Sequence, residues 1–253
     1  MNRFFVPPTL LLPGQRVNLP ATVAHQLVSV LRVRVGDEIA LLDGLGSEYP
    51  AVVEAVSRRE VAVLVGQGHV LDTEPTLRLS LYPSLLKGER FDFVLQKGTE
   101  VGVSRFVPTV SERSVARPAE GKGERWQRIV QEAAEQSHRA RVPAVAEPLP
   151  FAAACADAST ADLTLILWEE ERAASLRDVL GHHRQTYYDL AKHVSPPSVA
   201  LLIGPEGGYS AEEVQIAGTF GIIPVSLGRR ILRAETAAVV AATLVLAVFA
   251  EIG

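Results

Sequence analysis

The chain has 253 residues, of which 47% are hydrophobic and 21% charged, a composition typical of a folded globular protein with one large or two modest domains. Its net charge of −4 excludes a surface coated uniformly with basic charge for nucleic acid. The single cysteine, Cys155, excludes an internal disulfide framework and any zinc cluster built from several cysteines. The first residues lack the apolar core of a signal peptide, so we expect a cytoplasmic protein.

Residues 1–74 are typical of a small β-rich domain. Strands are predicted at 3–6, 38–42, 49–56 and 61–65, and a helix at 21–33, because its apolar residues recur at helical spacing. Several short strands at close spacing favour a small barrel. The polar, proline-marked sequence Asp72-Thr73-Glu74-Pro75 predicts a boundary, which gives one domain at 1–74 and a second at 75–253.

In the second domain predicted strands alternate with predicted helices. The strands are 77–82, 105–110, 163–168, 199–203 and 222–227, and the helices are 90–101, 123–137, 150–160 and one from 211. This alternation favours a parallel sheet covered by helices. Residues 182–197 are expected to form a polar loop, whose His182, His183 and His193 are interpreted as solvated side chains rather than metal ligands.

The final predicted helix, 237–250, contains no charged residue. Fourteen residues are too few for a membrane span, which needs about 20, so we expect no membrane association. A helix that is apolar on all sides must be covered on several of them. We therefore expect this helix to contribute to a homodimer interface.

Charge is distributed unevenly along the chain. Residues 1–74 contain 6 basic and 8 acidic residues, residues 75–145 contain 12 and 8, and residues 146–253 contain 7 and 13. Only the middle segment is positive. If the protein binds RNA, we expect phosphates to contact this segment and a few arginines outside it.

Two glycine-containing loops follow the last two predicted strands. The first is Gly204-Pro205-Glu206-Gly207-Gly208, before a helix whose Ser210 and Glu213 have the spacing of a capping box. Adjacent glycines can adopt positive φ and let a ligand approach the main chain, although a lone loop of this kind is as often an ordinary turn. The second is 228–236, before the final helix. It could share one pocket with the first.

Together the two loops closely resemble the signature of the SPOUT (trefoil-knotted) RNA methyltransferases, in the RsmE branch that methylates uridine N3 of 16S ribosomal RNA. The match covers 202–208 and 227–237, and further matches lie at 95–103, 108–114 and 132–137 with Arg139. The N-terminal residues His25, 30–32, Gly36-Asp37 and Asp43-Gly44 resemble the family's PUA-like RNA-binding domain. The resemblance implies an N-terminal PUA-like β-barrel followed by an α/β trefoil-knot domain, where pattern alone favours an unknotted doubly wound fold.

The resemblance implies S-adenosylmethionine (AdoMet) as methyl donor, without a metal. The residues expected to bind it are Leu167, Glu169, Ile203, Gly204, Glu206, Gly208, Leu227, Gly228, Ile231 and Leu232. Two residues are expected to be catalytic: Arg233 would stabilise the uridine anion, and Glu235 would accept its proton. Arginine itself stays protonated in proteins and cannot be the base. Glu235 could equally satisfy free donors at the start of the final helix.

The implied substrate is 16S ribosomal RNA of the small subunit. The residues expected to bind RNA are Arg3, Arg32, Lys97, Arg113, Gln136 and Arg139. Lys97 could instead stabilise the end of a helix, and Glu132, Gln136 and Arg139, expected on one helix face, could be merely solvated. His25 could be a packed helix residue. Two other functions stay open: methylation at another RNA position, such as a ribose 2′-hydroxyl, and a non-catalytic role in ribosome assembly.

Overall fold

The computed structural model describes residues 1–118, 121–189 and 196–252, without the side chains of 186–189. Residue contacts divide the described chain into two compact units. The first comprises Met1–Glu74 and Ala134–Val142, and the second Pro75–Ala133 and Pro143–Gly253. A domain boundary after Glu74 stays a prediction, and the inclusion of Ala134–Val142 in the first unit was not anticipated.

The first unit is built on a β-sheet with the strand order β1-β3-β4-β5-β2. Its strands are β1 (Arg3–Phe5), β2 (Arg16–Asn18), β3 (Glu38–Leu42), β4 (Ser47–Val56) and β5 (Val61–Val65), and a short β6 (His69–Val70) also pairs with β4. β1 pairs with β3 in parallel, and the other pairs are antiparallel. Three of the four predicted strands are therefore found within a residue of their expected bounds, and β4 begins two residues earlier.

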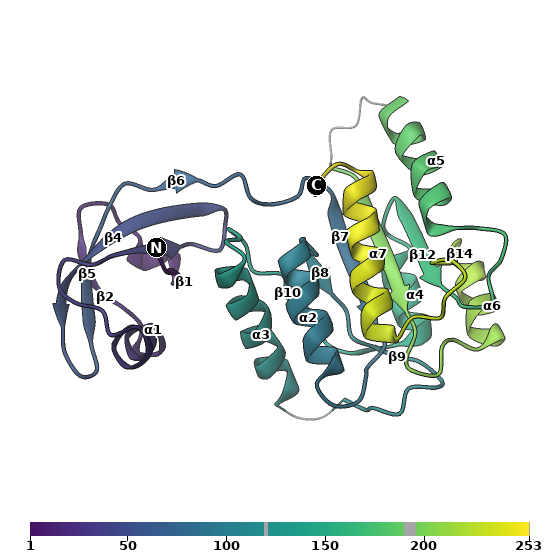
Figure 1. The fold of residues 1–253 in the computed structure, drawn as a ribbon, viewed down its shortest axis with the longest axis horizontal. Helices are drawn as coiled ribbons and strands as arrows, with labels where there is room; N and C mark the ends of the chain where they lie inside the picture. The colour runs from purple at the N-terminus through teal and green to yellow at the C-terminus, as the bar shows by residue number, and fades with distance from the viewer. Residues whose placement is uncertain (119–120, 190–195, 253) are drawn as a thin grey trace. The chain divides into compact units, whose positions relative to one another are not determined.

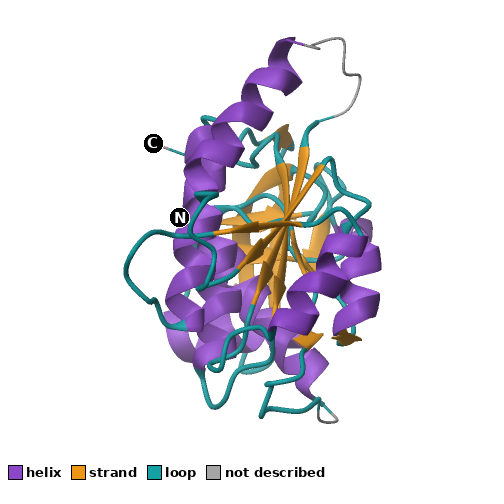
Figure 2. Ribbon diagram, turned by 90° about the vertical axis from the view of Figure 1, so that its right-hand side faces the viewer, coloured by secondary structure: helices purple, strands orange, loops and turns teal. Residues whose placement is uncertain are grey.

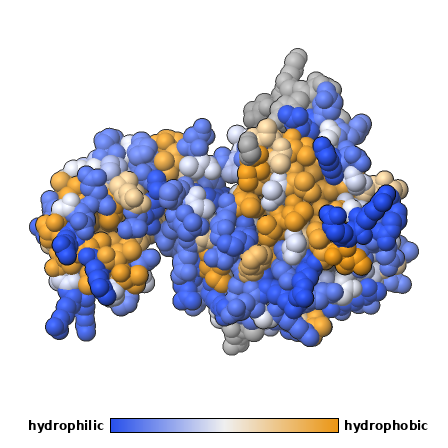
Figure 3. Space-filling view, in the orientation of Figure 1, coloured by the Kyte–Doolittle hydropathy of each residue, from blue (hydrophilic) through white to orange (hydrophobic). Residues whose placement is uncertain are grey.

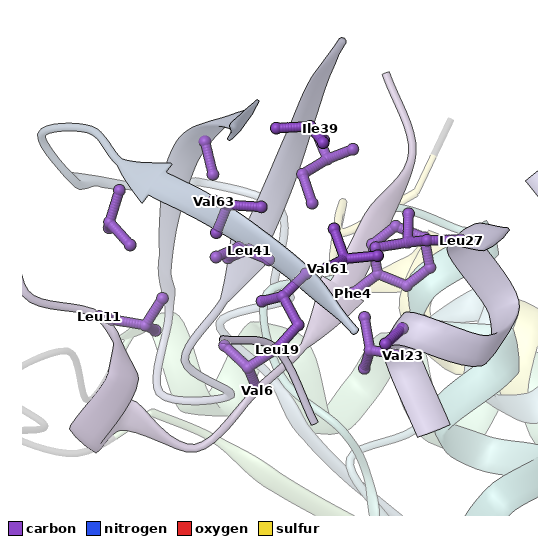
Figure 4. Close-up of a cluster of buried hydrophobic side chains, with 14 residues drawn as sticks. Phe4, Val6, Leu11, Leu19, Val23, Leu27, Ile39, Leu41, Val61 and Val63 are labelled. Carbon is purple, nitrogen blue, oxygen red and sulfur yellow. The ribbon is translucent and has the colours of Figure 1, made fainter. Parts of the chain in front are cut away.

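The helical elements of this unit are short, and two of them are continuous with each other. A 3₁₀ turn, η1 (Pro8–Leu10), precedes β2, and α1 (Ala21–His25) continues into a π-helical segment, η2 (Gln26–Leu31), so the predicted helix is present in this form. The segment ends at Arg32, whose φ of 54° lies in the left-handed region. Apolar side chains from η2, the sheet and the connecting loops gather in one core, which includes Phe4, Leu27 and Ile39 (Figure 4).

The second unit contains a six-stranded sheet with the order β10-β8-β7-β13-β12-β14. Its strands are β7 (Arg78–Pro83), β8 (Arg105–Phe106), β10 (Ala144–Val145), β12 (Leu163–Leu167), β13 (Ser198–Ile203) and β14 (Ile223–Val225). All neighbouring pairs are parallel. β9 (Thr109–Val110) and β11 (Leu149–Pro150) form a separate parallel pair. The parallel α/β class predicted from the alternating elements is confirmed.

Helices cover both faces of this sheet (Figures 1 and 2). They are α2 (Arg90–Val101), α3 (Lys122–Gln136), α4 (Phe151–Ala158), α5 (Leu176–Asp189), α6 (Ala211–Thr219) and α7 (Ala234–Val248). α7 packs against α2 and α5, and α4 packs against α6. The parallel strand order is compatible with the expected trefoil knot but does not require it, so the knot stays a prediction.

Two predictions of local structure are wrong. The strand expected at 105–110 is broken into β8 and β9, because Pro108 has no N–H to continue a ladder. Residues 182–189 lie in α5 rather than in a loop, and its Leu176 and Leu180 are buried. Residues 190–195, which include His193, lie outside the described part of the chain. No helix within the described residues is long and apolar enough to cross a membrane.

Candidate active site

A cavity of about 350 Å³ opens at the carboxyl ends of three neighbouring strands. Its walls are the loops after β12, β13 and β14, the first turn of α7, and Arg90 at the start of α2. β13, β12 and β14 lie side by side and run in parallel, so their following loops meet at one edge of the sheet. Ligand sites of open α/β sheets occur at this edge.

Every residue expected to bind the cofactor lines this cavity. These are Leu167, Glu169, Ile203, Gly204, Glu206, Gly208, Leu227, Gly228, Ile231 and Leu232. Arg233 and Glu235, the expected catalytic residues, line the same cavity. The sequence therefore located one site from loops that are separate in the chain, while the role of each residue stays a prediction.

The loop after β13 is held by contacts on both sides. Gly208 has a φ of 66°, and a Cβ atom there would lie only 2.1 Å from Oε1 of Glu169, so no larger residue fits without displacing that carboxylate. Arg113 Nη1 donates to the carbonyl oxygen of Gly207 at 2.9 Å. The carboxylate of Glu206 accepts hydrogen bonds from the Lys87 N–H at 3.1 Å and from Arg90 Nη1 at 3.3 Å.

The helix after this loop begins with the predicted capping box. Ser210 Oγ accepts from the Glu213 N–H at 3.3 Å, and Glu213 Oε2 accepts from the Ser210 N–H at 3.1 Å. Glu213 Oε1 also accepts from the Glu112 N–H at 2.8 Å, and Ser210 Oγ donates to Glu112 Oε2 at 2.6 Å. The segment that carries Arg113 is thereby fixed to the loop that Arg113 contacts.

The loop between β14 and α7 is more open. Gly228 adopts a φ of 107°, and its N–H donates to Ser226 Oγ at 3.0 Å. The side chains of Arg229 and Arg230 are exposed, and Ile231 is 86% exposed. Ile231 was expected to pack against the adenine of AdoMet, but in this conformation its side chain is not part of a closed apolar wall.

The first turn of α7 carries the two expected catalytic residues. Arg233 is the N-cap residue of α7; its side chain is exposed and makes no capping hydrogen bond. Glu235 Oε1 lies 3.9 Å from Arg90 Nε, and Glu235 Oε2 is buried without a hydrogen-bond partner in the described structure. The alternative that the Glu235 carboxylate satisfies free donors of α7 finds no support in these contacts.

The contribution of Arg90 was missed by the sequence reasoning. A signal was present, because a cation in the first turn of a helix is disfavoured by the helix dipole, and Arg90 begins the predicted helix 90–101. Such a residue needs compensating carboxylates, which here are Glu206 and Glu235. Trp168 Nε1 is a second buried polar atom of the lining without a hydrogen-bond partner in the described structure.

The residues expected to bind RNA in the first unit have different environments. Arg32 and Gln136 are exposed, whereas Arg3 forms an ion pair with Glu48 at 2.6 Å. Arg139 is only 4% exposed, and its Nη2 lies 2.6 Å from Glu74 Oε2. The structure thus gives Arg139 a structural position rather than an accessible one.

The expected shared face of Glu132, Gln136 and Arg139 is wrong. α3 ends at Gln136, and Glu132 and Gln136 are exposed while Arg139 is buried beyond the helix end.

In the second unit, Lys97 and Arg113 already have intramolecular partners. Lys97 Nζ donates to Glu100 at 2.7 Å, one turn further along α2. Arg113 braces the loop after β13 and remains partly accessible. Within the described residues, no group of three or more His, Cys, Asp or Glu side chains could hold a metal ion. The expectation of a metal-free site stays a prediction.

Comparisons with known proteins define first the class and then the family. A family model described as an RNA methyltransferase domain matches residues 73–246, and one described as an RNA methyltransferase PUA domain matches residues 19–65. The chain thus belongs to the class of RNA methyltransferases with an N-terminal PUA domain.

The chain is 37% identical over 230 residues to ribosomal RNA small subunit methyltransferase E of Synechocystis, covering 89% of this chain and 71% of the relative. It is 30% identical over 250 residues to the Bacillus subtilis protein of the same name, covering 94% and 93%. The crystal structure of the Neisseria gonorrhoeae enzyme of this name, bound to S-adenosyl methionine, matches with a TM-score of 0.84 and 33% identity over 98% of this chain and 97% of that one. The chain belongs to the ribosomal RNA small subunit methyltransferase E family.

Proposed function

We propose that this protein transfers a methyl group from AdoMet to N3 of one uridine in 16S ribosomal RNA. The observation that carries the proposal is the cavity at the carboxyl ends of β12, β13 and β14. Ten expected cofactor residues line it together with Arg233 and Glu235. Membership of a family named for methylation of small-subunit ribosomal RNA supports the substrate.

The lining of the cavity fits AdoMet. Its volume lies within the range of small-molecule sites. Leu167, Ile203, Leu227 and Leu232 offer apolar surface for an adenine ring, and the Glu169 carboxylate offers a negative charge to a cationic ligand. The related gonococcal enzyme was crystallised with this molecule. When bound, AdoMet supplies an electrophilic methyl group, and no metal is needed for that chemistry.

The reaction at uridine requires that the N3 proton be removed or its charge offset. We assign proton acceptance to Glu235, because its Oε2 is buried in the cavity lining without a hydrogen-bond partner. Arg233, the N-cap residue of α7, lines the same cavity and has an exposed side chain. We assign to its guanidinium the stabilisation of the negative charge that develops on the base. Glu235 Oε2 would accept the N3 proton, so that N3 can take the methyl group as the methyl–sulfur bond of AdoMet breaks and S-adenosylhomocysteine leaves.

RNA binding is proposed to use exposed arginines. Arg32 at the end of η2, Arg229 and Arg230 at the cavity and Arg113 beside it all present cationic side chains on the surface. Phosphate contacts of this kind position RNA without reading its sequence. Arg3, Lys97 and Gln136 remain in the proposed set, with the first two also paired to glutamates.

We further propose two functional domains, 1–74 for RNA binding and 75–253 for methyl transfer.

We also propose that the protein is a homodimer. An apolar surface lies over α7 (Figure 3), and Val240 of α7 and Phe93 of α2 are 37% and 43% exposed. Exposed apolar patches commonly mark interfaces. Light scattering should give twice the chain mass at micromolar concentration, and a monomer would contradict the proposal. The proposed ribosomal substrate places the enzyme in the cytoplasm.

The product is tested with small ribosomal subunits from a strain that lacks the modification. After incubation with enzyme and AdoMet, mass spectrometry of the digested RNA should detect N3-methyluridine. Primer extension should gain one stop, because N3 methylation blocks the Watson–Crick edge. A ribose-methylated nucleoside without N3-methyluridine would favour the alternative methyltransferase. Absence of both products together with absence of AdoMet binding would favour a non-catalytic assembly factor.

A further inference from the structure

We propose that Arg90 is a positioning residue for Glu235: it holds one oxygen of this carboxylate and leaves the other free in the cavity to receive the uridine proton. This inference rests on the proposed function, because it assigns a partner to the proton acceptor named there. It concerns a residue outside both glycine loops. Arg90 begins α2, which follows β7 rather than any of the strands that form the pocket.

The geometry divides the two oxygens of Glu235 into different environments. Oε1 faces the Arg90 guanidinium, with 3.9 Å to Nε, whereas Oε2 is buried and has no hydrogen-bond partner in the described structure. A buried carboxylate oxygen without a donor is unfavourable unless a ligand supplies one. An N–H group of a bound base would supply that donor.

Arg90 is held in place by a second carboxylate. Its Nη1 lies 3.3 Å from Oε1 of Glu206, and the same oxygen accepts the Lys87 N–H at 3.1 Å. One guanidinium therefore connects Glu206, in the loop after β13, with Glu235, in the first turn of α7. Since a guanidinium is planar and presents donors in a fixed fork, an arginine fixed at one end restricts a carboxylate at its other end.

The position of Arg90 in its own helix is otherwise unfavourable. A cation in the first turn meets the positive end of the helix dipole. Arg90 therefore disfavours the start of α2 but pairs with Glu206 and Glu235 at the cavity. Such a conflict with local helix preference is typical of residues that serve a functional site.

The experiment compares single-turnover rates, the KM for ribosomal RNA and the AdoMet Kd for Arg90→Gln, Glu235→Gln, the double variant and Arg90→Lys. Arg90→Gln should lower the rate at least tenfold while KM and Kd change less than twofold, because the interaction acts on the proton acceptor rather than on binding. Arg90→Lys, which retains the charge but not the planar fork, should recover only part of the rate. The double variant should be no slower than Glu235→Gln alone.

Arg125→Gln is the matched control. Arg125 of α3 pairs with Asp92 of α2, the helix that carries Arg90, and Arg125 lies outside the cavity lining. Its loss should therefore leave the rate within twofold of wild type. Thermal unfolding identifies a folding defect. If Arg90→Gln unfolds early, Arg90→Met, which retains the aliphatic stem, takes its place in the comparison.

Two results would overturn the proposed role of Arg90 and leave the proposed function intact. One is a double variant that is slower than Glu235→Gln by the full factor seen for Arg90→Gln. The other is an AdoMet Kd or a ribosomal RNA KM that rises in Arg90→Gln by the same factor as the rate falls, which would show that the arginine acts on binding rather than on the proton acceptor. A Glu235→Gln variant with the wild-type rate would instead remove the proton acceptor from the proposed function.

Discussion

Replacing Gly208 with alanine tests whether the Glu169 carboxylate, which lies beside the loop after β13, contacts the bound ligand. The added Cβ would lie 2.1 Å from Oε1 of Glu169, far inside contact distance, so the carboxylate must move by about 1 Å. Gly208 also has a φ of 66°, a conformation that costs an alanine about 1–2 kcal/mol. The substitution therefore has a stability cost and a separate effect on Glu169.

Gly221→Ala separates these two effects. Gly221 lies in the same unit with a φ of 75°, and an added Cβ there meets no atom within 4 Å. It is absent from the cavity lining. Both variants should lose about 1–2 kcal/mol of unfolding free energy, which lowers the Tm by roughly 2–4 °C per kcal/mol in a chain of this size.

Only Gly208→Ala should weaken AdoMet binding. If Glu169 makes a charge-assisted hydrogen bond to the bound cation, its displacement costs about 1.5–3 kcal/mol, or roughly 10- to 150-fold in Kd. Isothermal titration calorimetry measures this directly, with Glu169→Gln as a further comparison. Equal AdoMet affinity in Gly208→Ala and Gly221→Ala would refute the placement of Glu169 against the ligand.

Three further predictions follow from individual contacts. Arg113→Ala should weaken AdoMet binding as well as RNA binding, because Arg113 holds the carbonyl of the first loop; unchanged calorimetric affinity for AdoMet would contradict this. Arg139→Ala should lower stability in urea unfolding and leave RNA affinity unchanged after correction for the folded fraction, because its guanidinium is buried on Glu74. Burial alone would raise the pKa of Asp157, but hydrogen bonds from Tyr82 and Arg105 outweigh it and lower the pKa. The stabilisation is thus present above the ordinary value of 3.8 and lost as pH falls through the lower folded value. Urea midpoints should fall more steeply below pH 4 in wild type than in Asp157→Asn, and parallel curves would contradict the assignment.

Much of the fold followed from local periodicity. The helix predicted at 90–101 has these bounds in the structure, and β3 and β5 begin and end where apolar residues and turn signals predicted. These elements were predictable because short-range spacing determines which face of a strand or helix is buried. α5 was missed because its exposed face is rich in charged and histidine residues, and among its described side chains only Leu176 and Leu180 are buried.

The site was predictable as a place but less so as a set of contacts. The two glycine loops indicated a pocket from sequence alone, since a strand followed by glycines and a capped helix is a local pattern. The burial of Arg139 depends on Glu74, and the role of Arg90 depends on carboxylates in two other loops. Such pairs are formed by the tertiary fold, and no spacing along a single sequence reveals them.

Three departures from local preference in this protein lie at the cavity where a ligand is expected. Arg90 begins a helix against the dipole, Gly208 holds a positive φ against a carboxylate, and Glu235 buries an oxygen without a donor, all at one cavity. In the first unit, Arg32 adopts a left-handed conformation directly after a π-helical segment. Strain and unpaired polar groups are common at functional sites, although they also occur elsewhere in this chain, as at His138, Ala250 and His183 Nε2. The carboxylates at the cavity suit a cationic methyl donor, and in the first unit Arg32 presents a cation to solvent, which suits an RNA phosphate. An enzyme that binds both ligands needs both features.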